Sequence, residues 1–112
     1  MLPAPLWSAR ITTADQTCTV FLEGELDMVA AKALRDLLIT ELDTRETTTV
    51  VADLADVTFL DSAALGALIN AYQHADTTGR RFAVRNPTQA VRRILEITGV
   101  LDLLCPPEPA QN

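Results

Sequence analysis

The stretch Val50-Val-Ala-Asp-Leu-Ala-Asp-Val-Thr-Phe-Leu-Asp-Ser-Ala-Ala-Leu-Gly66 decides the fold of this chain. Its apolar start is typical of a strand that is buried on both faces in the middle of a parallel sheet. The short acidic segment that follows leads into the first turn of a helix, which we expect to begin near Ser62. A serine there lies beside unpaired backbone N–H groups and a positive partial charge, so this position would accommodate a phosphate well.

Upstream of this stretch, the sequence predicts a hairpin followed by a helix. The segments Leu6–Thr13 and Thr17–Glu23 are expected to be strands, and the short turn between them makes the pair antiparallel. Gly24 interrupts the alternation of the second strand. Asp27 is expected to cap a helix over about Met28–Asp43.

Downstream, strands and helices alternate, which predicts an α/β fold with a mixed β-sheet of four to five strands, the N-terminal hairpin and flanking helices. The expected elements are a strand at Thr49–Leu54, a connection at Ala55–Leu60, a helix at Ser62–Thr78, a strand at Arg81–Arg85, a helix at Thr88–Thr98 and an edge strand at Val100–Leu104. We expect one domain over residues 1–104 and a disordered, proline-rich tail over residues 105–112.

The composition is that of a globular protein with an acidic surface. Of the 112 residues, 48% are hydrophobic, which is enough to build a core. The formal net charge of −6 argues against a nucleic-acid partner, because phosphate binding needs a basic face. The chain starts without the pattern of a signal peptide, and no run approaches the roughly 20 apolar residues of a membrane-spanning helix. We therefore expect a soluble, cytoplasmic protein without a membrane partner.

No residue pattern predicts a metal or cofactor site. Cys18 and Cys105 are far apart in the sequence, and neither belongs to a Cys-x-x-Cys or Cys/His pair, so we expect reduced thiols. The four glycines are scattered, which excludes a phosphate-binding loop or a dinucleotide-binding fingerprint.

Catalysis by Ser62 is not supported by its surroundings. The residues around it lack both glycines of the G-x-S-x-G elbow of esterases. His74 would lie about 18 Å further along the same helix, too far to act as a base, and is expected to be a surface residue. Asp53, Asp56 and Asp61 could line the end of the sheet and supply paired carboxylates for acid–base chemistry, but we favour turn and capping roles for them. We therefore do not expect an enzyme.

Two interpretations of Ser62 remain open. By base rate, a serine at this boundary is a helix cap. The neighbouring residues favour the other interpretation, in which Ser62 lies on a surface that a partner approaches. Ala63 and Ala64 are small, and Gly66 leaves the helix start open to a partner's backbone.

Three segments of the sequence resemble a known family. They are Gly24-Glu-Leu-Asp27, Asp53-Leu-Ala-Asp-Val-Thr-Phe-Leu-Asp-Ser-Ala-Ala-Leu-Gly66, and Asn86-Pro87 with Val91-Arg92-Arg-Ile-Leu95 and Gly99. The chain is similar, over roughly Ile11 to Leu104, to the STAS family and specifically to its stand-alone bacterial members, the anti-sigma factor antagonists.

The resemblance implies a function for Ser62, which stands where the family has a phosphorylatable serine or threonine at the start of the second helix. The implied partners are a GHKL-type serine kinase that is also an anti-sigma factor, and a Ser/Thr phosphatase. Phosphorylation by the kinase would end binding, and the phosphatase would restore it. The expected partner-binding residues are Asp27, Met28, Leu60, Asp61, Ser62, Ala63, Ala64 and Gly66.

One position departs from the family pattern of a small residue followed by Gly-Leu-Gly, because Ala64 replaces the first glycine. The extra methyl group is expected to narrow partner choice or to slow phosphorylation. Another role open to this domain type is that of a small cytoplasmic subunit of a lipid-transport ATPase complex. A regulatory domain detached from an anion transporter is less favoured, because the sequence starts at Met1 and has no membrane segment.

Overall fold

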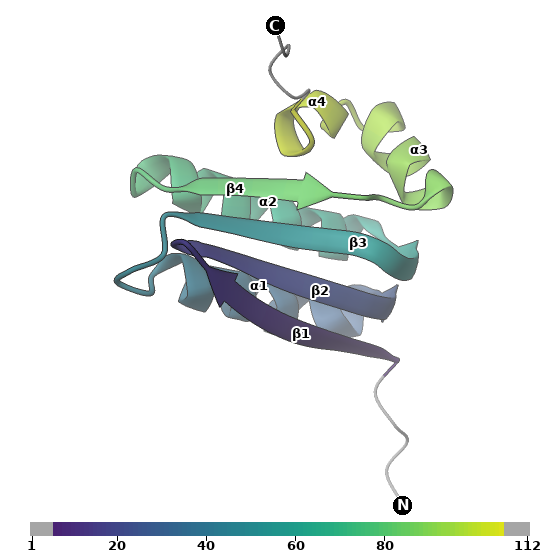
Figure 1. Ribbon diagram of the computed structural model, residues 1–112. Helices are drawn as coiled ribbons and strands as arrows, with labels where there is room; N and C mark the ends of the chain where they lie inside the picture. The colour runs from purple at the N-terminus through teal and green to yellow at the C-terminus, as the bar shows by residue number, and fades with distance from the viewer. Residues whose placement is uncertain (1–5, 107–112) are drawn as a thin grey trace, which may run out of the picture.

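The computed structural model describes residues 6–106, which form one α/β domain (Figure 1). Its elements are β1 (Trp7–Ala14), β2 (Thr17–Leu26), α1 (Met28–Leu42), β3 (Thr49–Leu60), α2 (Ser62–Thr77), β4 (Arg81–Arg85), α3 (Gln89–Ile97) and α4 (Leu101–Leu104). The strands form one mixed sheet in the order β1-β2-β3-β4. β1 is antiparallel to β2, whereas β2, β3 and β4 are parallel to one another. The predicted fold class and the N-terminal hairpin are thus confirmed.

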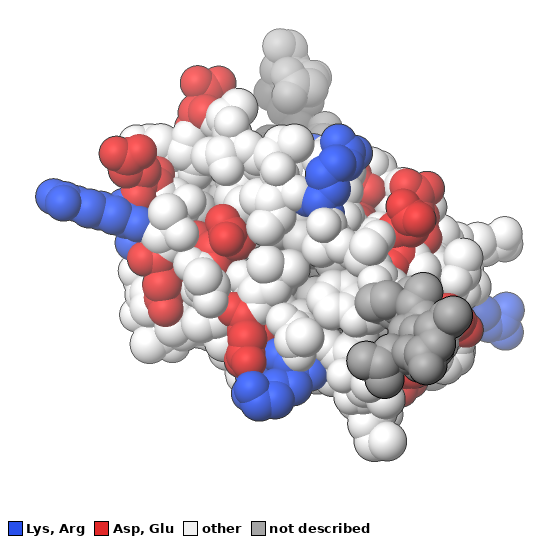
Figure 2. All heavy atoms as spheres, turned by 90° about the horizontal axis from the view of Figure 1, so that it is seen from below, with Lys and Arg blue, Asp and Glu red and all other residues white. Residues whose placement is uncertain are grey.

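The helices are distributed unevenly around the sheet. α1 and α2 lie on the same face of it; α4 lies beside β4 at one edge, and α3, which contacts β3 and α4, lies near the end of β4 (Figure 1). The core between the helices and the sheet is almost entirely aliphatic. Its largest fully buried side chains are Leu22, Leu26, Leu34, Leu38, Leu42, Leu54, Leu60, Leu68, Leu95, Leu104, Val20 and Val50. Seen from the β1 side, charged side chains of both signs are scattered over the surface (Figure 2).

A two-residue turn closes the hairpin between β1 and β2. Asp15 and Gln16 have φ angles of 51° and 68°, in the left-handed region that a tight hairpin turn requires. Ala14 and Thr17 flank the turn as register partners, and the ladder continues without interruption to Trp7 and Gly24. The turn therefore fixes the register of β1 over its whole length.

The parallel pairing of β2 with β3 makes both strands end at the same edge of the sheet. Leu26 and Leu60 are register partners, and the N–H of Asp61 donates to the carbonyl of Leu26 at 3.1 Å. Each strand is followed within two residues by a helix, so α1 and α2 also begin side by side. This shared start of two helices positions the candidate site.

Two predicted boundaries were wrong. The third strand does not stop at Leu54 but continues through the expected connection to Leu60, because the long strand β2 offers it a partner over its whole length and because Val57 and Leu60 are buried. The expected edge strand at Val100–Leu104 is instead the helix α4, in which Leu101 and Leu104, three residues apart, turn toward the core.

Other expectations concern the chain end and membranes. Of the expected tail over residues 105–112, only Cys105 and Pro106 are described, and Cys105 packs against the core; the rest lies outside the described residues. Between residues 6 and 106, no helix is both long and apolar enough to cross a membrane.

Candidate functional site

Two aspartates cap the adjacent helix starts. The carboxylate of Asp27 accepts hydrogen bonds from the N–H groups of Val29 at 3.0 Å and Ala30 at 3.2 Å, as predicted for the cap of α1. The carboxylate of Asp61 accepts from the N–H of Ala64 at 2.9 Å and caps α2. Both helix N-termini are therefore satisfied by carboxylates at the same edge of the sheet.

Ser62 is the first residue of α2 and is exposed. Because Asp61 supplies the cap, the interpretation of Ser62 as the helix cap is wrong. Within residues 6–106 the Ser62 hydroxyl makes no hydrogen bond. The side chain is thus free to react or to contact a partner without breaking an internal interaction.

Large apolar side chains are exposed in the first turn of α1 and near the end of β3, the elements that meet at this edge of the sheet. Met28 and Val29, in the first turn of α1, are 74% and 86% exposed, and Phe59 near the end of β3 is 47% exposed. Sequence analysis included Met28 and missed the other two residues. The available signals were that Val29 lies off the apolar stripe of its helix, and that Phe59 precedes the buried Leu60 and so points to the opposite face of the strand.

A shallow groove of about 300 Å³ runs between α1 and α2 from this end of the molecule. Its lining residues are Met28, Ala31, Lys32 and Arg35 of α1 and Ala63, Gly66, Ala67 and Asn70 of α2. A Cβ atom added to Gly66 would meet nothing within 4 Å. Internal packing therefore does not require a glycine here, although glycine costs about 1 kcal/mol in a helix relative to alanine.

Leu60 and Ala64 need correction as partner-binding residues. Leu60 is 1% exposed and Ala64 is fully buried, so both side chains belong to the core and offer no surface to a partner. Because the methyl group of Ala64 is buried, it offers no surface through which to narrow partner choice by direct contact, whereas a slower phosphorylation stays a prediction. Asp27, Met28, Asp61, Ser62, Ala63 and Gly66 do reach the surface at this end of the molecule.

The carboxylates considered for acid–base chemistry have structural contacts instead. Asp53 is 6% exposed and accepts hydrogen bonds from the side chains of Arg85 at 3.3 Å and Asn86 at 3.1 Å, and from the backbone N–H of Ala55 at 3.0 Å. Asp61 is occupied by capping. These contacts agree with the turn and capping roles expected for these two residues.

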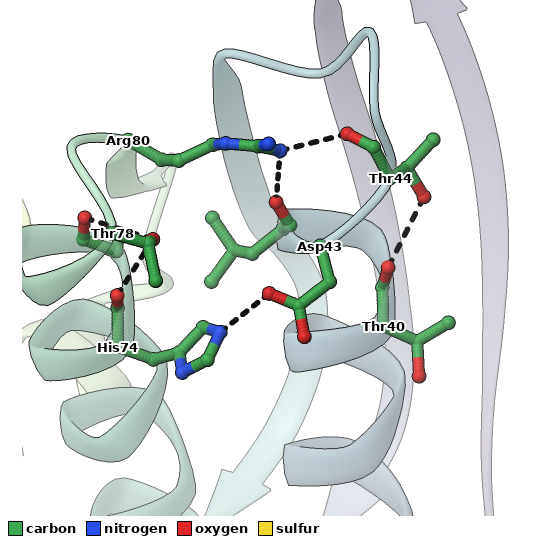
Figure 3. A network of polar contacts seen from close by, with 8 residues as sticks. Thr40, Asp43, Thr44, His74, Thr78 and Arg80 are labelled. Carbon is green, nitrogen blue, oxygen red and sulfur yellow. Dashed lines mark hydrogen bonds and ion pairs between the residues drawn. The ribbon is translucent and has the colours of Figure 1, made fainter.

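His74 lies at the opposite end of α2 from Ser62 and is engaged there (Figure 3). Its Nε2 atom lies 2.6 Å from the carboxylate of Asp43, which ends α1. Arg80 donates to the backbone carbonyls of Leu42 and Thr44 in the same network. These contacts join the C-terminal ends of the two helices, so His74 is more than the surface residue that the sequence predicted.

Both cysteines are free thiols, and burial protects them from ionisation. Burial, together with the contact with the Glu41 carboxylate, raises the pKa of the Cys18 thiol to about 11. Burial also raises the pKa of the Cys105 thiol. In the described part of the chain, no three His, Cys, Asp or Glu side chains are grouped so that they could hold a metal ion.

Comparisons with known proteins identify the family. The family model of the STAS domain matches residues 8–110. The anti-sigma-B factor antagonist of Staphylococcus aureus is 27% identical over 93 residues, which cover 83% of this chain and 85% of that protein. The crystal structure of an anti-sigma factor antagonist from Mycobacterium paratuberculosis is similar with a TM-score of 0.79 and 31% identity, covering 97% of this chain and 92% of that one. The anti-sigma factor antagonist SpoIIAA in its unphosphorylated form has the same fold, with a TM-score of 0.73 at 22% identity and coverage of 83% and 82%. The chain belongs to the STAS domain family.

Proposed function

We propose that this protein is an anti-sigma factor antagonist whose binding is controlled at Ser62. In its unphosphorylated form it binds a GHKL-type serine kinase that is also an anti-sigma factor, and so releases the sigma factor. The observation that carries this proposal is the exposed, unbonded hydroxyl of Ser62 on the first turn of α2. The names of the relatives support the regulatory role, which is exercised in the cytoplasm on transcription through protein contacts rather than by catalysis.

Exposed apolar surface next to Ser62 would supply much of the binding energy. Met28, Val29 and Phe59 are large and exposed, and burying them would be favourable by about 25 cal/mol for each Å² removed from water. The neutral hydroxyl of Ser62 would lie within or at the rim of that contact. Such an arrangement makes the interface sensitive to a charge introduced at one atom.

Phosphorylation would place that charge where the fold tolerates it and the interface does not. The kinase would transfer the γ-phosphoryl group of ATP to the Ser62 oxygen, with loss of the hydroxyl proton and release of ADP. The phosphate adds about −1.5 to −2 charges, which the N-terminus of α2 stabilises. The neighbouring carboxylate of Asp61 would repel the phosphate and keep it directed outward, into the space of the partner. A Ser/Thr phosphatase would restore the hydroxyl and the binding.

The two serines of the chain allow a matched test of the modification site. Incubation with the cognate kinase and ATP should add one phosphate to the wild-type protein, as measured by mass spectrometry with site mapping. Ser62→Ala should accept none, whereas Ser8→Ala, which removes the other serine, should be modified like the wild type. A phosphate on a threonine or on Ser8 would contradict the proposal.

Binding to the kinase tests the consequence of the modification. Ser62→Ala should bind with nearly wild-type affinity, and Ser62→Asp should bind at least about tenfold more weakly because of the added charge. Equal binding of Ser62→Asp and wild type would overturn the switch. Stable co-purification with a transporter ATPase, independent of Ser62, would instead indicate the role of a structural subunit in a lipid-transport complex.

A further inference from the structure

Among residues 6–106, nothing covers strand β1 on its outer edge or on its two faces. It forms one edge of the sheet and pairs only with β2 among the described strands. Seven of its eight residues are exposed, because α1 packs against β2 and β3 and leaves both faces of β1 uncovered. The opposite edge, at β4, has α4 beside it and α3 near its end (Figure 1). One edge of the sheet is thus accompanied by helices and the other is open.

This open edge lacks the features that usually prevent strands from pairing between molecules. Such features are prolines, lysines, bulges and inward-pointing charges. β1 contains no proline, no lysine and no interruption of its register with β2, and its single charged residue is Arg10. The guanidinium of Arg10 lies 4.5 Å from the centre of the Phe21 ring, so it covers the sheet face and not the outer edge.

The hydrogen bonds of the hairpin define which backbone groups point outward. In an antiparallel pair, residues alternate between bonding to the partner strand and pointing away from it. The carbonyl of Leu6 accepts from the N–H of Glu25 at 2.9 Å, which fixes the phase of this alternation: even-numbered residues bond to β2. The outward N–H and C=O groups are therefore those of Trp7, Ala9, Ile11 and Thr13.

We propose that β1 pairs with β1 of a second copy of this chain, in antiparallel orientation about a two-fold axis at Ile11. The two four-stranded sheets would then form one continuous sheet. In this register Ile11 faces Ile11 of the second copy, and Ala9 faces Thr13, all through outward-pointing backbone groups. A contact of this kind is isologous and closes on itself, as most homodimers do.

Charge selects this register over its neighbour. With the axis at Ile11, Arg10 faces Thr12 of the second copy, whereas an axis at Arg10 would place two arginines directly opposite each other, which is unfavourable. The strand contains no acidic residue, although the whole chain carries a net charge of −6. On the face seen in Figure 2, charged side chains of both signs are scattered. Ile11, 39% exposed, would gain an apolar contact at the axis.

The dimer is independent of the proposed switch at Ser62. Ser62 follows β3, and the sheet order places β2 between β3 and β1. A dimer through β1 therefore leaves the Ser62 surface free, and failure of either proposal does not affect the other.

Sedimentation or light scattering over a wide concentration range tests the association. As the protein concentration increases, the average mass of the wild-type protein should rise from that of one chain toward that of two chains. Ala9→Pro removes an outward N–H that bonds only in the dimer, so it should raise the concentration needed for dimers at least about tenfold while the monomer stays folded by circular dichroism. Ile11→Lys should do the same by opposing two ammonium groups at the axis. The matched control Ile97→Lys, at a position 73% exposed on α3, should dimerise like the wild type.

A crosslink tests the register. In a Cys105→Ser background, Ile11→Cys should form an intermolecular disulfide on mild oxidation, because residues opposed in a hydrogen-bonded antiparallel pair lie about 5.5 Å apart at their Cα atoms. Ile97→Cys should crosslink much less. A monomer at all concentrations would overturn the proposal, as would a dimer that both Ala9→Pro and Ile11→Lys leave unchanged.

Discussion

At the scale of single residues, Asp61 caps α2, and the modification that we propose falls on its neighbour Ser62. The Asp61 carboxylate satisfies the N-terminus of α2, whereas the Ser62 side chain makes no hydrogen bond within the described chain. The stability of α2 should therefore depend on the aspartate and hardly on the serine. The same division leaves Ser62, the proposed site of phosphorylation, without a structural role at the helix start.

We expect Asp61→Ala to lower the free energy of unfolding by about 1 kcal/mol through loss of the cap, and Ser62→Ala to change it by less than about 0.5 kcal/mol. Urea denaturation measures both values. Asp61→Asn is the control, since asparagine also caps well and should retain most of the stability. Equal losses in Asp61→Ala and Ser62→Ala would contradict the division of roles.

At Gly66, the stability of the helix and the proposed contact with the partner should respond in opposite directions to one substitution. Gly66→Ala should stabilise the protein by up to about 1 kcal/mol, because a Cβ meets no neighbour there and alanine favours the helix. It should also weaken binding to the kinase, because the groove beside Ser62 becomes narrower. Gly79→Ala is the contrasting variant: its φ of 73° makes alanine strained, so it should destabilise the fold. Unchanged kinase affinity in Gly66→Ala would remove the groove from the interface.

The buried thiol of Cys18 makes stability depend on alkaline pH. Its pKa is raised to about 11 by burial and the contact with Glu41, from 9.0 in an unfolded chain. The stabilising contribution is complete below pH 9 and is lost as the pH rises from 9 to 11, where the unfolded state ionises first. Wild type should lose about 1–2 kcal/mol more than Cys18→Val over this interval in urea titrations. Parallel losses in the two proteins would contradict the assignment.

At the scale of elements, α1 and α2 are fastened at both ends by different contacts. Their N-termini are held by capping and by the shared ends of β2 and β3, and their C-termini by the network of His74, Asp43 and Arg80 (Figure 3). Arg80 donates to the carbonyl of Leu42, the last residue of α1, and to the carbonyl of Thr44, which also accepts from the N–H of Thr47 at 3.0 Å.

Arg80→Ala should lower the free energy of unfolding by about 1–2 kcal/mol, because it removes charge-assisted hydrogen bonds to these carbonyls. Arg80→Lys should recover part of the loss, since both hydrogen bonds come from one guanidinium nitrogen and an ammonium can also donate more than one bond, but on a shorter side chain. Thermal or urea unfolding measures the effect. Phosphorylation of Ser62, at the other end of the helices, should proceed at the wild-type rate; a large change in that rate would show that the two ends are coupled.

The sequence predicted those elements whose signals are local. Three of these were predicted directly: the cap at Asp27, the hairpin turn and the alternation in β2. A capping role for Asp61 was among the roles that we favoured for the aspartates. Each of these signals depends only on neighbouring residues. The extension of β3 to Leu60 was missed because it depends on β2, a distant partner that stays extended to Leu26. The helix α4 was missed because a five-residue apolar segment fits either structure until its surroundings are known.

The candidate site was predicted in outline for a similar reason. Position in the sequence placed Ser62 at a helix start, but it could not separate exposed from buried neighbours. Leu60 and Ala64 turn into the core and Phe59 and Val29 turn out, and these directions depend on how the helices pack on the sheet.

At the scale of the whole molecule, the proposed switch needs no change of fold. The phosphate would be added to a chain whose net charge is already −6, at a point where the helix N-terminus favours negative charge. The signal would be read by direct contact with the partner rather than through a rearrangement of the domain.

The phosphorylated protein should therefore have a melting temperature within about 3 °C of the unmodified one, since 1 kcal/mol corresponds to a few degrees in a domain of this size. Backbone amide chemical shifts should change mainly near the starts of α1 and α2. Ser62→Ala treated with kinase and ATP is the control. Shift changes spread over β1 and α3 would instead indicate a conformational switch.

The cap at Asp61 has a consequence for how variation is tolerated. The aspartate maintains the fold and the serine does not. We therefore expect position 61 to be constrained by stability and position 62 by the proposed signalling role. In a saturation library, substitutions at position 62 should leave cellular abundance intact while abolishing signalling, whereas most substitutions at position 61 should reduce both. Comparing abundance scores with activity scores along the chain would thus separate residues that transmit information from residues that maintain the structure.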